Sequence, residues 1–141
     1  MWVGRLVDLI EEHADELTER LVRMVREDPR TIGYGEVSDG ELGGRAREVY
    51  SHLGKWLTKS SESAVESEYF RLAEVRRAEG IPLSEVVMAL LLVRRNLWQF
   101  VESHGANTSL ELRQQLDLEL LVVRFFDRAI FHAVRGYESG D

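Results

Sequence analysis

The sequence predicts an all-α fold, and three observations lead to this prediction. Apolar residues recur at helical spacing along five stretches of the chain, and no stretch shows the alternation that is typical of strands. The chain has only two prolines, and both fall at the ends of these stretches. We therefore expect residues 1–141 to form one domain, a bundle of about five helices.

The first expected helix covers residues 2–26 and ends before Pro29. Its acidic residues precede its arginines, which is the order that the helix dipole favours. After one long loop, Ser38 followed by Glu41 reads as a capping box and begins a second helix. That helix ends near Lys59, and its three glycines weaken it.

Turn residues separate the three remaining helices. The third helix is expected over residues 62–79, because Gly80 is suited to follow a helix end and Pro82 lies just beyond it. The fourth helix is expected over about residues 84–104. The fifth begins at Thr108 or Ser109 and continues to about Tyr137, so it is the longest of the five.

Composition and charge exclude several classes of function. The formal net charge of −7 argues against a nucleic-acid binder and against adhesion to an anionic membrane. The absence of cysteine excludes disulfides, thiolate metal sites and thiol nucleophiles. Acidic residues interrupt the first apolar stretch, so no signal peptide is expected, and no apolar run is long enough to span a membrane. These observations predict a soluble, cytoplasmic domain.

One charged residue in the fourth expected helix lies on its apolar side. Arg94 and Arg95 follow an uncharged run from Val86 to Val93. On a helical wheel, Arg95 lies on the polar side of the helix, whereas Arg94 lies within the apolar arc. Glu119 lies within the apolar arc of the last helix. A short turn joins the two helices, so in an antiparallel pair Arg94 and Glu119 lie at the same level along the helix axes. We therefore infer a buried ion pair between them. Alternatively, Arg94 binds a ligand carboxylate or phosphate.

Arg76 also falls on an apolar helix face, in line with Tyr69. An arginine near the end of a helix often binds the last carbonyl groups, and this structural role is the simpler interpretation. The alternative hypothesis joins Arg76, Arg94 and Tyr69 in one anion pocket for a small-molecule ligand.

The four histidines lie on separate expected helices, so they predict no metal site. One axial histidine suffices for haem, which leaves His13 or His132 as an alternative haem ligand. His52, followed by Gly54 and Lys55, permits a comparison with histidine phosphotransfer domains. No spacing indicates a catalytic triad or a pair of catalytic carboxylates, so we expect that the protein is not an enzyme.

Two segments carry a resemblance to a known family. They are "YFRLAEVRRAEGIPLSEVVMALLLVRRNLW", residues 69–98, and "FFDRAIFHAVRGYE", residues 125–138. They resemble the N-terminal domain of the RsbR and RsbRD-type stressosome co-antagonists. The resemblance implies an all-α, in some members globin-like, sensory input domain that is usually dimeric, binds no haem, and precedes an output module such as a STAS domain or a histidine kinase.

The resemblance leads us to expect a non-catalytic signal-transduction domain that has no cofactor and acts through protein contacts. Because the chain ends at Asp141 without an output domain, it is expected to be an excised domain or to act on a separate protein partner. The alternatives are a haem or small-ligand sensor with the same fold and a phosphotransfer protein that uses His52.

The last helix predicts a homodimer, because it is apolar over more than half of its circumference. A symmetric dimer is the commonest way to cover such a surface. The candidate interface residues are Leu118, Val122 and Phe125, together with Trp2 from the first helix. The alternative is that the last helix is central and is enclosed by its own domain.

Overall fold

The computed structural model describes residues 2–58, 61–104 and 106–140, and these residues form eight helices and no strand. The predicted all-α class is confirmed. None of the helices within the described ranges is long and apolar enough to cross a membrane.

The helices in chain order are α1 (Trp2–Glu12), α2 (Ala14–Glu27), the 3-10 helix η1 (Pro29–Glu36), α3 (Asp39–Ser51), α4 (Leu53–Trp56), α5 (Glu62–Ala78), α6 (Leu83–Ser103) and α7 (Ser109–Glu138). The expected number of about five helices is therefore too low. The first two expected helices are each divided, and the expected long loop contains η1. The three C-terminal helices agree with the sequence to within one or two residues.

Both divisions occur at a histidine with a non-helical backbone. His13 has φ −104° and ψ 19°, and His52 has φ −129° and ψ 36°. Next to the second break, the amide of Gly54 donates to Glu11 Oε2 at 3.0 Å. This side chain of α1 satisfies an amide at the start of α4, so the chain gains a tertiary contact where the helix is interrupted. Such long-range contacts are not visible in the local helical period.

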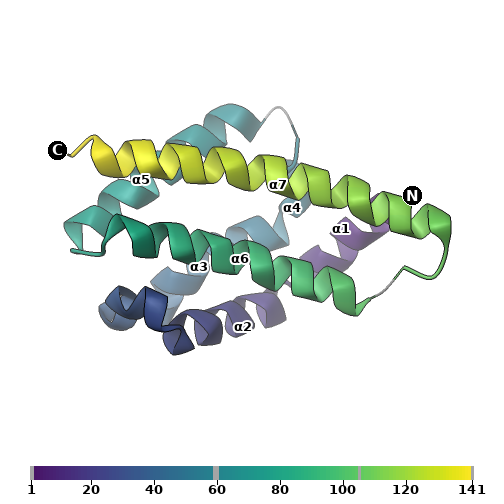
Figure 1. Cartoon of the computed structure of the whole chain (residues 1–141), viewed down its shortest axis with the longest axis horizontal. Coiled ribbons are helices and arrows are strands. Elements are labelled where there is room, and N and C mark those ends of the chain that lie inside the picture. The colour runs from purple at the N-terminus through teal and green to yellow at the C-terminus, as the bar shows by residue number, and fades with distance from the viewer. Residues whose placement is uncertain (1, 59–60, 105, 141) are drawn as a thin grey trace.

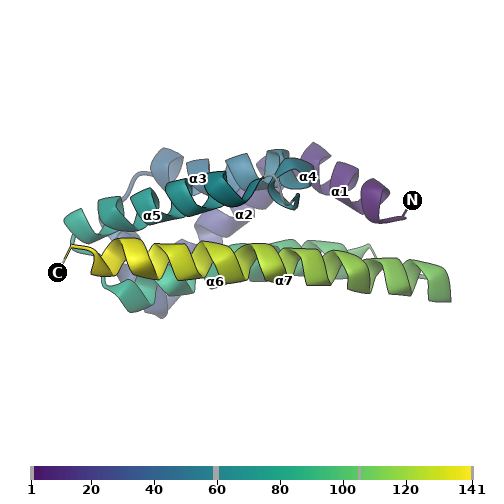
Figure 2. The same cartoon turned by 90° about the horizontal axis from the view of Figure 1, so that it is seen from above.

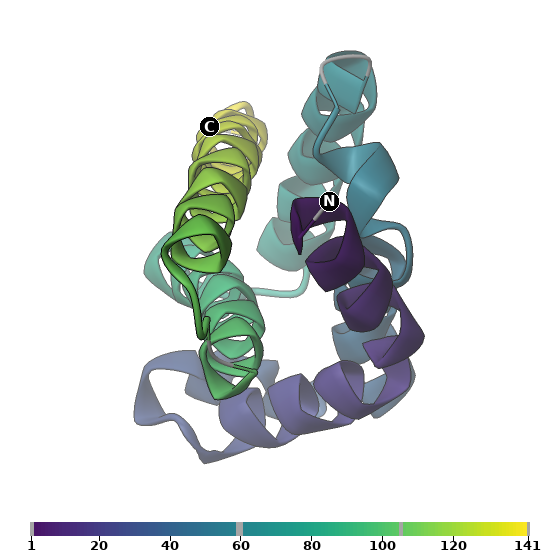
Figure 3. The same cartoon turned by 90° about the vertical axis from the view of Figure 1, so that its right-hand side faces the viewer.

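The buried apolar side chains form a core, and the helices around it are arranged as two walls (Figure 1). Helices α6 and α7 run side by side in opposite directions and form one wall, while α1, α3, α4 and α5 form the other (Figure 2). Seen from the end, α2 connects the two walls along one side (Figure 3). Helix α7 packs most extensively against α5, and α2 packs against α3 and α6.

The contact between α5 and α7 depends on a glycine. A Cβ atom added at Gly136 would lie 2.2 Å from the carbonyl oxygen of Phe70, far inside the van der Waals limit. The two backbones therefore approach each other more closely than any other residue type at this position would allow. The C-terminal part of α7 is consequently fixed against α5.

A buried amide connects α2, α3 and α6 on the other side of the core. The side chain of Asn96 is fully buried, and its Nδ2 donates to the carbonyl of Leu17 at 2.8 Å and to the Tyr50 hydroxyl at 3.1 Å. Its Oδ1 accepts from Arg20 Nε at 2.5 Å. The Tyr50 hydroxyl in turn donates to the carbonyl of Val93 at 2.9 Å. All of these groups have partners, so the network fixes the relative positions of three helices.

Candidate functional site

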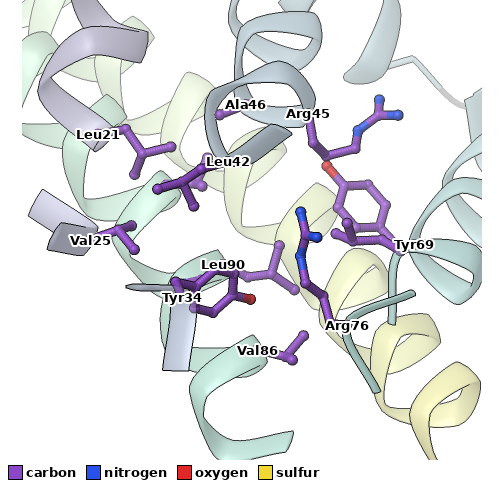
Figure 4. A pocket seen from close by; sticks show the side chains of 13 residues that line it. Leu21, Val25, Tyr34, Leu42, Arg45, Ala46, Tyr69, Arg76, Val86 and Leu90 are labelled. Carbon is purple, nitrogen blue, oxygen red and sulfur yellow. The ribbon is translucent and has the colours of Figure 1, made fainter. Parts of the chain in front are cut away.

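A partly open cavity lies where α2, η1, α3, α5 and α6 meet (Figure 4). Its volume is about 40 Å³, which is room for about three water molecules. Most of the lining is apolar and comes from Leu21, Val25, Leu42, Ala46, Leu72, Val86, Ala89, Leu90 and Val93. Four polar side chains complete it: Tyr34, Arg45, Tyr69 and Arg76. The cavity thus combines an apolar wall with two guanidinium groups and two phenols.

Arg76 reaches from the last turn of α5 toward the middle of the lining side chains (Figure 4). Only 5% of the residue is exposed. Its Nη1 donates to Glu79 Oε1 at 2.7 Å, and its guanidinium lies 5.6 Å from the centre of the Tyr34 ring. Because a guanidinium has five N–H bonds, the contact with Glu79 uses only part of its donor capacity.

Unlike that of Arg76, the guanidinium of Arg45 is directed away from the middle of the cavity (Figure 4). Its Nη1 donates to Glu68 Oε2 at 2.7 Å, and its guanidinium stacks over Trp56 at 5.0 Å and over Tyr69 at 5.5 Å. Its Nε and Nη2 are buried without a hydrogen-bond partner. In Figure 4 this guanidinium turns away from Arg76, so mainly the alkyl part of Arg45 faces the cavity.

The two phenols of the cavity are neutral at physiological pH. Burial raises the pKa of Tyr34 to about 12, although the nearby charge of Arg76 opposes this shift. Burial also raises the pKa of Tyr69 to about 12, with the charge of Arg45 acting in the opposite direction. Both hydroxyl groups therefore keep their protons, and both can donate a hydrogen bond to an acceptor in the cavity.

The structure brings together only two of the three residues that we expected in an anion pocket. Tyr69 and Arg76 both line the cavity, whereas Arg94 lies in a separate groove between α6 and α7. Sequence reasoning missed Tyr34 and Arg45. A spacing of three between the buried residues Thr31, Tyr34 and Val37 is the period of a 3-10 helix, and it could have indicated that this segment packs on the core.

The groove between α6 and α7 contains Arg94, Arg95, Trp98, Glu102 and Glu119 among its lining residues. Arg94 and Glu119 are half-buried, and no ion pair joins them among the described residues. The full burial that we expected for this pair is therefore not observed, because both side chains line an open groove. The two charges do lie in the same groove, and their pairing stays a prediction.

An exposed apolar stripe runs along α7 beside this groove. It consists of Leu112, Leu116, Leu120, Val123 and Phe131, which are between 36% and 65% exposed. Their spacing places them on one side of the helix. Arg135 lies over the ring of Phe131, with 5.9 Å between the guanidinium and the ring centre.

The interface candidates Leu118, Val122 and Phe125 lie on the other side of α7. They are 0%, 2% and 0% exposed, because α5, α6 and α1 cover them. All three side chains are buried within the single chain, as the central-helix alternative expects for this side of α7, so they offer no free surface to a second copy. The side chain of Trp2 lies outside the described residues.

The histidines named in the sequence analysis lie apart from the cavity. His52 is exposed, and its Nδ1 lies 3.3 Å from Glu48 Oε2. His13 Nδ1 contacts the carbonyl of Leu9 at 2.8 Å, and the buried Nδ1 of His132 has no hydrogen-bond partner. Within the described ranges, no group of three or more His, Cys, Asp and Glu residues could hold a metal ion.

Comparison with known proteins gives one family. The family model described as the RsbT co-antagonist protein rsbRD N-terminal domain matches residues 15–140. No curated protein and no solved structure matches the chain. The matched range includes η1, α3 to α7 and nearly all of α2, and it therefore contains both the cavity and the groove.

Proposed function

The chain belongs to the family of RsbT co-antagonist protein rsbRD N-terminal domains, and from this membership we propose that it is a non-catalytic, sensory input domain that acts through protein contacts. The family consists of signal-transduction domains. In this proposal the domain self-associates as a cytoplasmic homodimer. A change in how the two copies pack is then passed on to an output domain or a partner protein.

The exposed stripe on α7 is the observation that carries this proposal. Its four members nearest the groove, Leu112, Leu116, Leu120 and Val123, recur over three turns of one helix. Single exposed apolar residues are common, but a continuous apolar row beside a groove marks a surface that another protein covers. The stripe, and not the buried side of α7 that we expected, is therefore the proposed interface.

A second copy of the chain fits this face because the charges beside the stripe are self-complementary. Arg95 and Glu102 are both exposed in the groove, two turns apart on α6. A two-fold axis between the two residues brings Arg95 of one copy near Glu102 of the other. In the proposed dimer, the same axis also relates the two stripes to each other.

We expect the wild-type chain to form dimers and the Leu120→Glu variant to stay monomeric. Leu120 is 65% exposed, so the substitution adds a charge to the interface and leaves the core unchanged. Sedimentation equilibrium over concentrations on the order of 1–100 µM measures the dissociation constant, and we expect it to rise at least about tenfold.

Val75→Glu is the matched control, because Val75 is an exposed apolar residue, at 45%, on α5 and away from the stripe. This variant is expected to dimerise like the wild type. A wild-type chain that is monomeric over the whole concentration range contradicts the dimer, and equal weakening by both substitutions contradicts the position of the interface.

The haem and phosphotransfer alternatives receive no specific support. The cavity of about 40 Å³ is lined by none of the histidines, and pockets for ligands of haem size occupy several hundred Å³. His52 is exposed, as a phosphate acceptor must be, but its nearest charged neighbour is the carboxylate of Glu48. A negative group beside the acceptor disfavours an incoming phosphoryl group.

A further inference from the structure

We propose that the cavity between α3, α5 and α6 binds a small monocarboxylate with a short apolar body, and that Arg76 holds its carboxylate. This inference deepens the proposed sensory function, because it names the class of ligand that such a domain would detect. It depends on the contacts of Arg76, on the charges around it and on the size of the cavity.

The first step is that a cavity lies beside a buried cation. Protein cores are normally packed without voids larger than a water molecule, and residual cavities lower stability. Burying a guanidinium is also unfavourable unless its donors are satisfied. Arg76 has 7% of its side chain exposed and donates to Glu79 through Nη1. A ligand oxygen in the cavity can occupy this space and accept from guanidinium N–H bonds that Glu79 does not use.

The second step is that the charges favour a single negative charge on the ligand. The carboxylate of Glu79 is paired with Arg76, and that of Glu68 is paired with Arg45, so the lining has little positive charge to spare for a ligand. A phosphate dianion would need further cations, whereas a monocarboxylate needs one edge of a guanidinium. The hydroxyl groups of Tyr34 and Tyr69 are neutral donors in the same lining and can assist without adding charge.

The third step is that the apolar lining residues and the cavity volume determine the polarity and the size of the rest of the ligand. Nine of the lining residues are apolar, so a polar body would lose its hydrogen bonds with water and find few replacements. A volume of about 40 Å³ admits about three water molecules, and a ligand that replaces them has roughly four to six non-hydrogen atoms. Acetate, propionate and butyrate have this size and chemistry.

The test uses propionate as the probe, with propionamide as its uncharged counterpart and inorganic phosphate as a second anion. Isothermal titration calorimetry on the full chain measures affinity, and the ¹⁵N-detected resonance of the Arg76 Nε–H group reports contact at the site. We expect propionate to bind with a dissociation constant on the order of 0.1–1 mM and to shift this resonance. Propionamide and phosphate are expected to bind at least about tenfold more weakly.

Two variants locate the site. Arg76→Gln removes the charge and is expected to weaken propionate binding at least about tenfold. The matched control is Arg71→Gln, because Arg71 is an exposed arginine on the same helix and does not line the cavity. Ala89→Leu fills the cavity and leaves the Arg76–Glu79 pair in place, so it is expected to abolish binding. It keeps the test decisive if Arg76→Gln does not fold.

The inference is overturned if propionate does not bind up to about 10 mM, a concentration at which even weak ligands are detected. It is equally overturned if propionamide or phosphate binds as well as propionate, or if Arg76→Gln and Ala89→Leu both bind like the wild type. Because sedimentation of the Leu120→Glu variant tests self-association independently, failure to bind propionate is distinguishable from failure of the proposed function.

Discussion

Phe125→Glu is expected to leave the domain unfolded at 25 °C. The ring of Phe125 is fully buried and contacts three other rings, those of Trp56, Tyr69 and Phe126, with centroid distances of 6.1, 5.9 and 5.0 Å. Removing a buried phenylalanine costs about 3–5 kcal/mol, and an unpaired buried carboxylate adds several more. The sum approaches the whole stability of a typical domain, about 5–15 kcal/mol. Circular dichroism during urea unfolding measures the loss.

Phe131→Glu is the control for this prediction, because it makes the same substitution on the same helix. Phe131 is 60% exposed, so its replacement is expected to change the free energy of unfolding by less than about 0.5 kcal/mol. The comparison is made at a protein concentration low enough to dissociate a dimer. A folded Phe125→Glu variant that stays monomeric in sedimentation equilibrium at concentrations where the wild type dimerises would contradict this expectation and favour an interface through Phe125.

Gly136→Ala is expected to be the most damaging small substitution in the chain. The added methyl group would lie 2.2 Å from the carbonyl oxygen of Phe70, and neither backbone can move without separating α5 from α7. Overpacking of this kind costs roughly 3 kcal/mol, which exceeds the roughly 1 kcal/mol that alanine normally gains over glycine in a helix. Thermal unfolding measures the net effect.

Gly44→Ala gives the opposite expectation for the same chemical change. Gly44 is an exposed helical residue of α3, and a Cβ atom there would have no neighbour within 4 Å. This variant is expected to be more stable than the wild type by about 0.5–1 kcal/mol. If both substitutions stabilise the domain, the close approach of α5 and α7 does not exist in solution.

Local signals in the sequence correctly predicted the start of α3, the end of α5 and the start of α7. The Ser38 hydroxyl accepts from the amide of Glu41 at 3.2 Å, which is one of the two hydrogen bonds of a capping box. Gly80 has φ 79°, the left-handed conformation expected after the end of α5. The Thr108 hydroxyl caps α7 by accepting from the amide of Glu111 at 3.1 Å. Each of these features depends on residues within four positions, and such information is present in the local sequence.

Which side of a helix is covered could not be predicted in the same way. The wheel of α7 shows a wide apolar arc, but it does not show that α5 covers Phe125 and leaves Leu120 exposed. The cavity is similar, because Tyr34 and Arg76 meet only through the packing of η1 on α6 and α5. Contacts between residues that are distant in the chain determine both features, and a single sequence does not report them.

The close packing of α7 at Gly136 has a consequence for local unfolding. Near this end, the Tyr137 hydroxyl donates to the carbonyl of Ile81 at 2.7 Å, and Arg77 Nη1 donates to the carbonyl of Tyr137 at 2.7 Å. The first turns carry the exposed Leu112 and Leu116. Local unfolding of a helix requires the least free energy where few tertiary contacts are lost. Amide hydrogen exchange should therefore be slow near residue 136 and fast near residue 112, with intermediate rates between them. One continuous helix thus joins a region that opens readily to one that opens only when the domain unfolds.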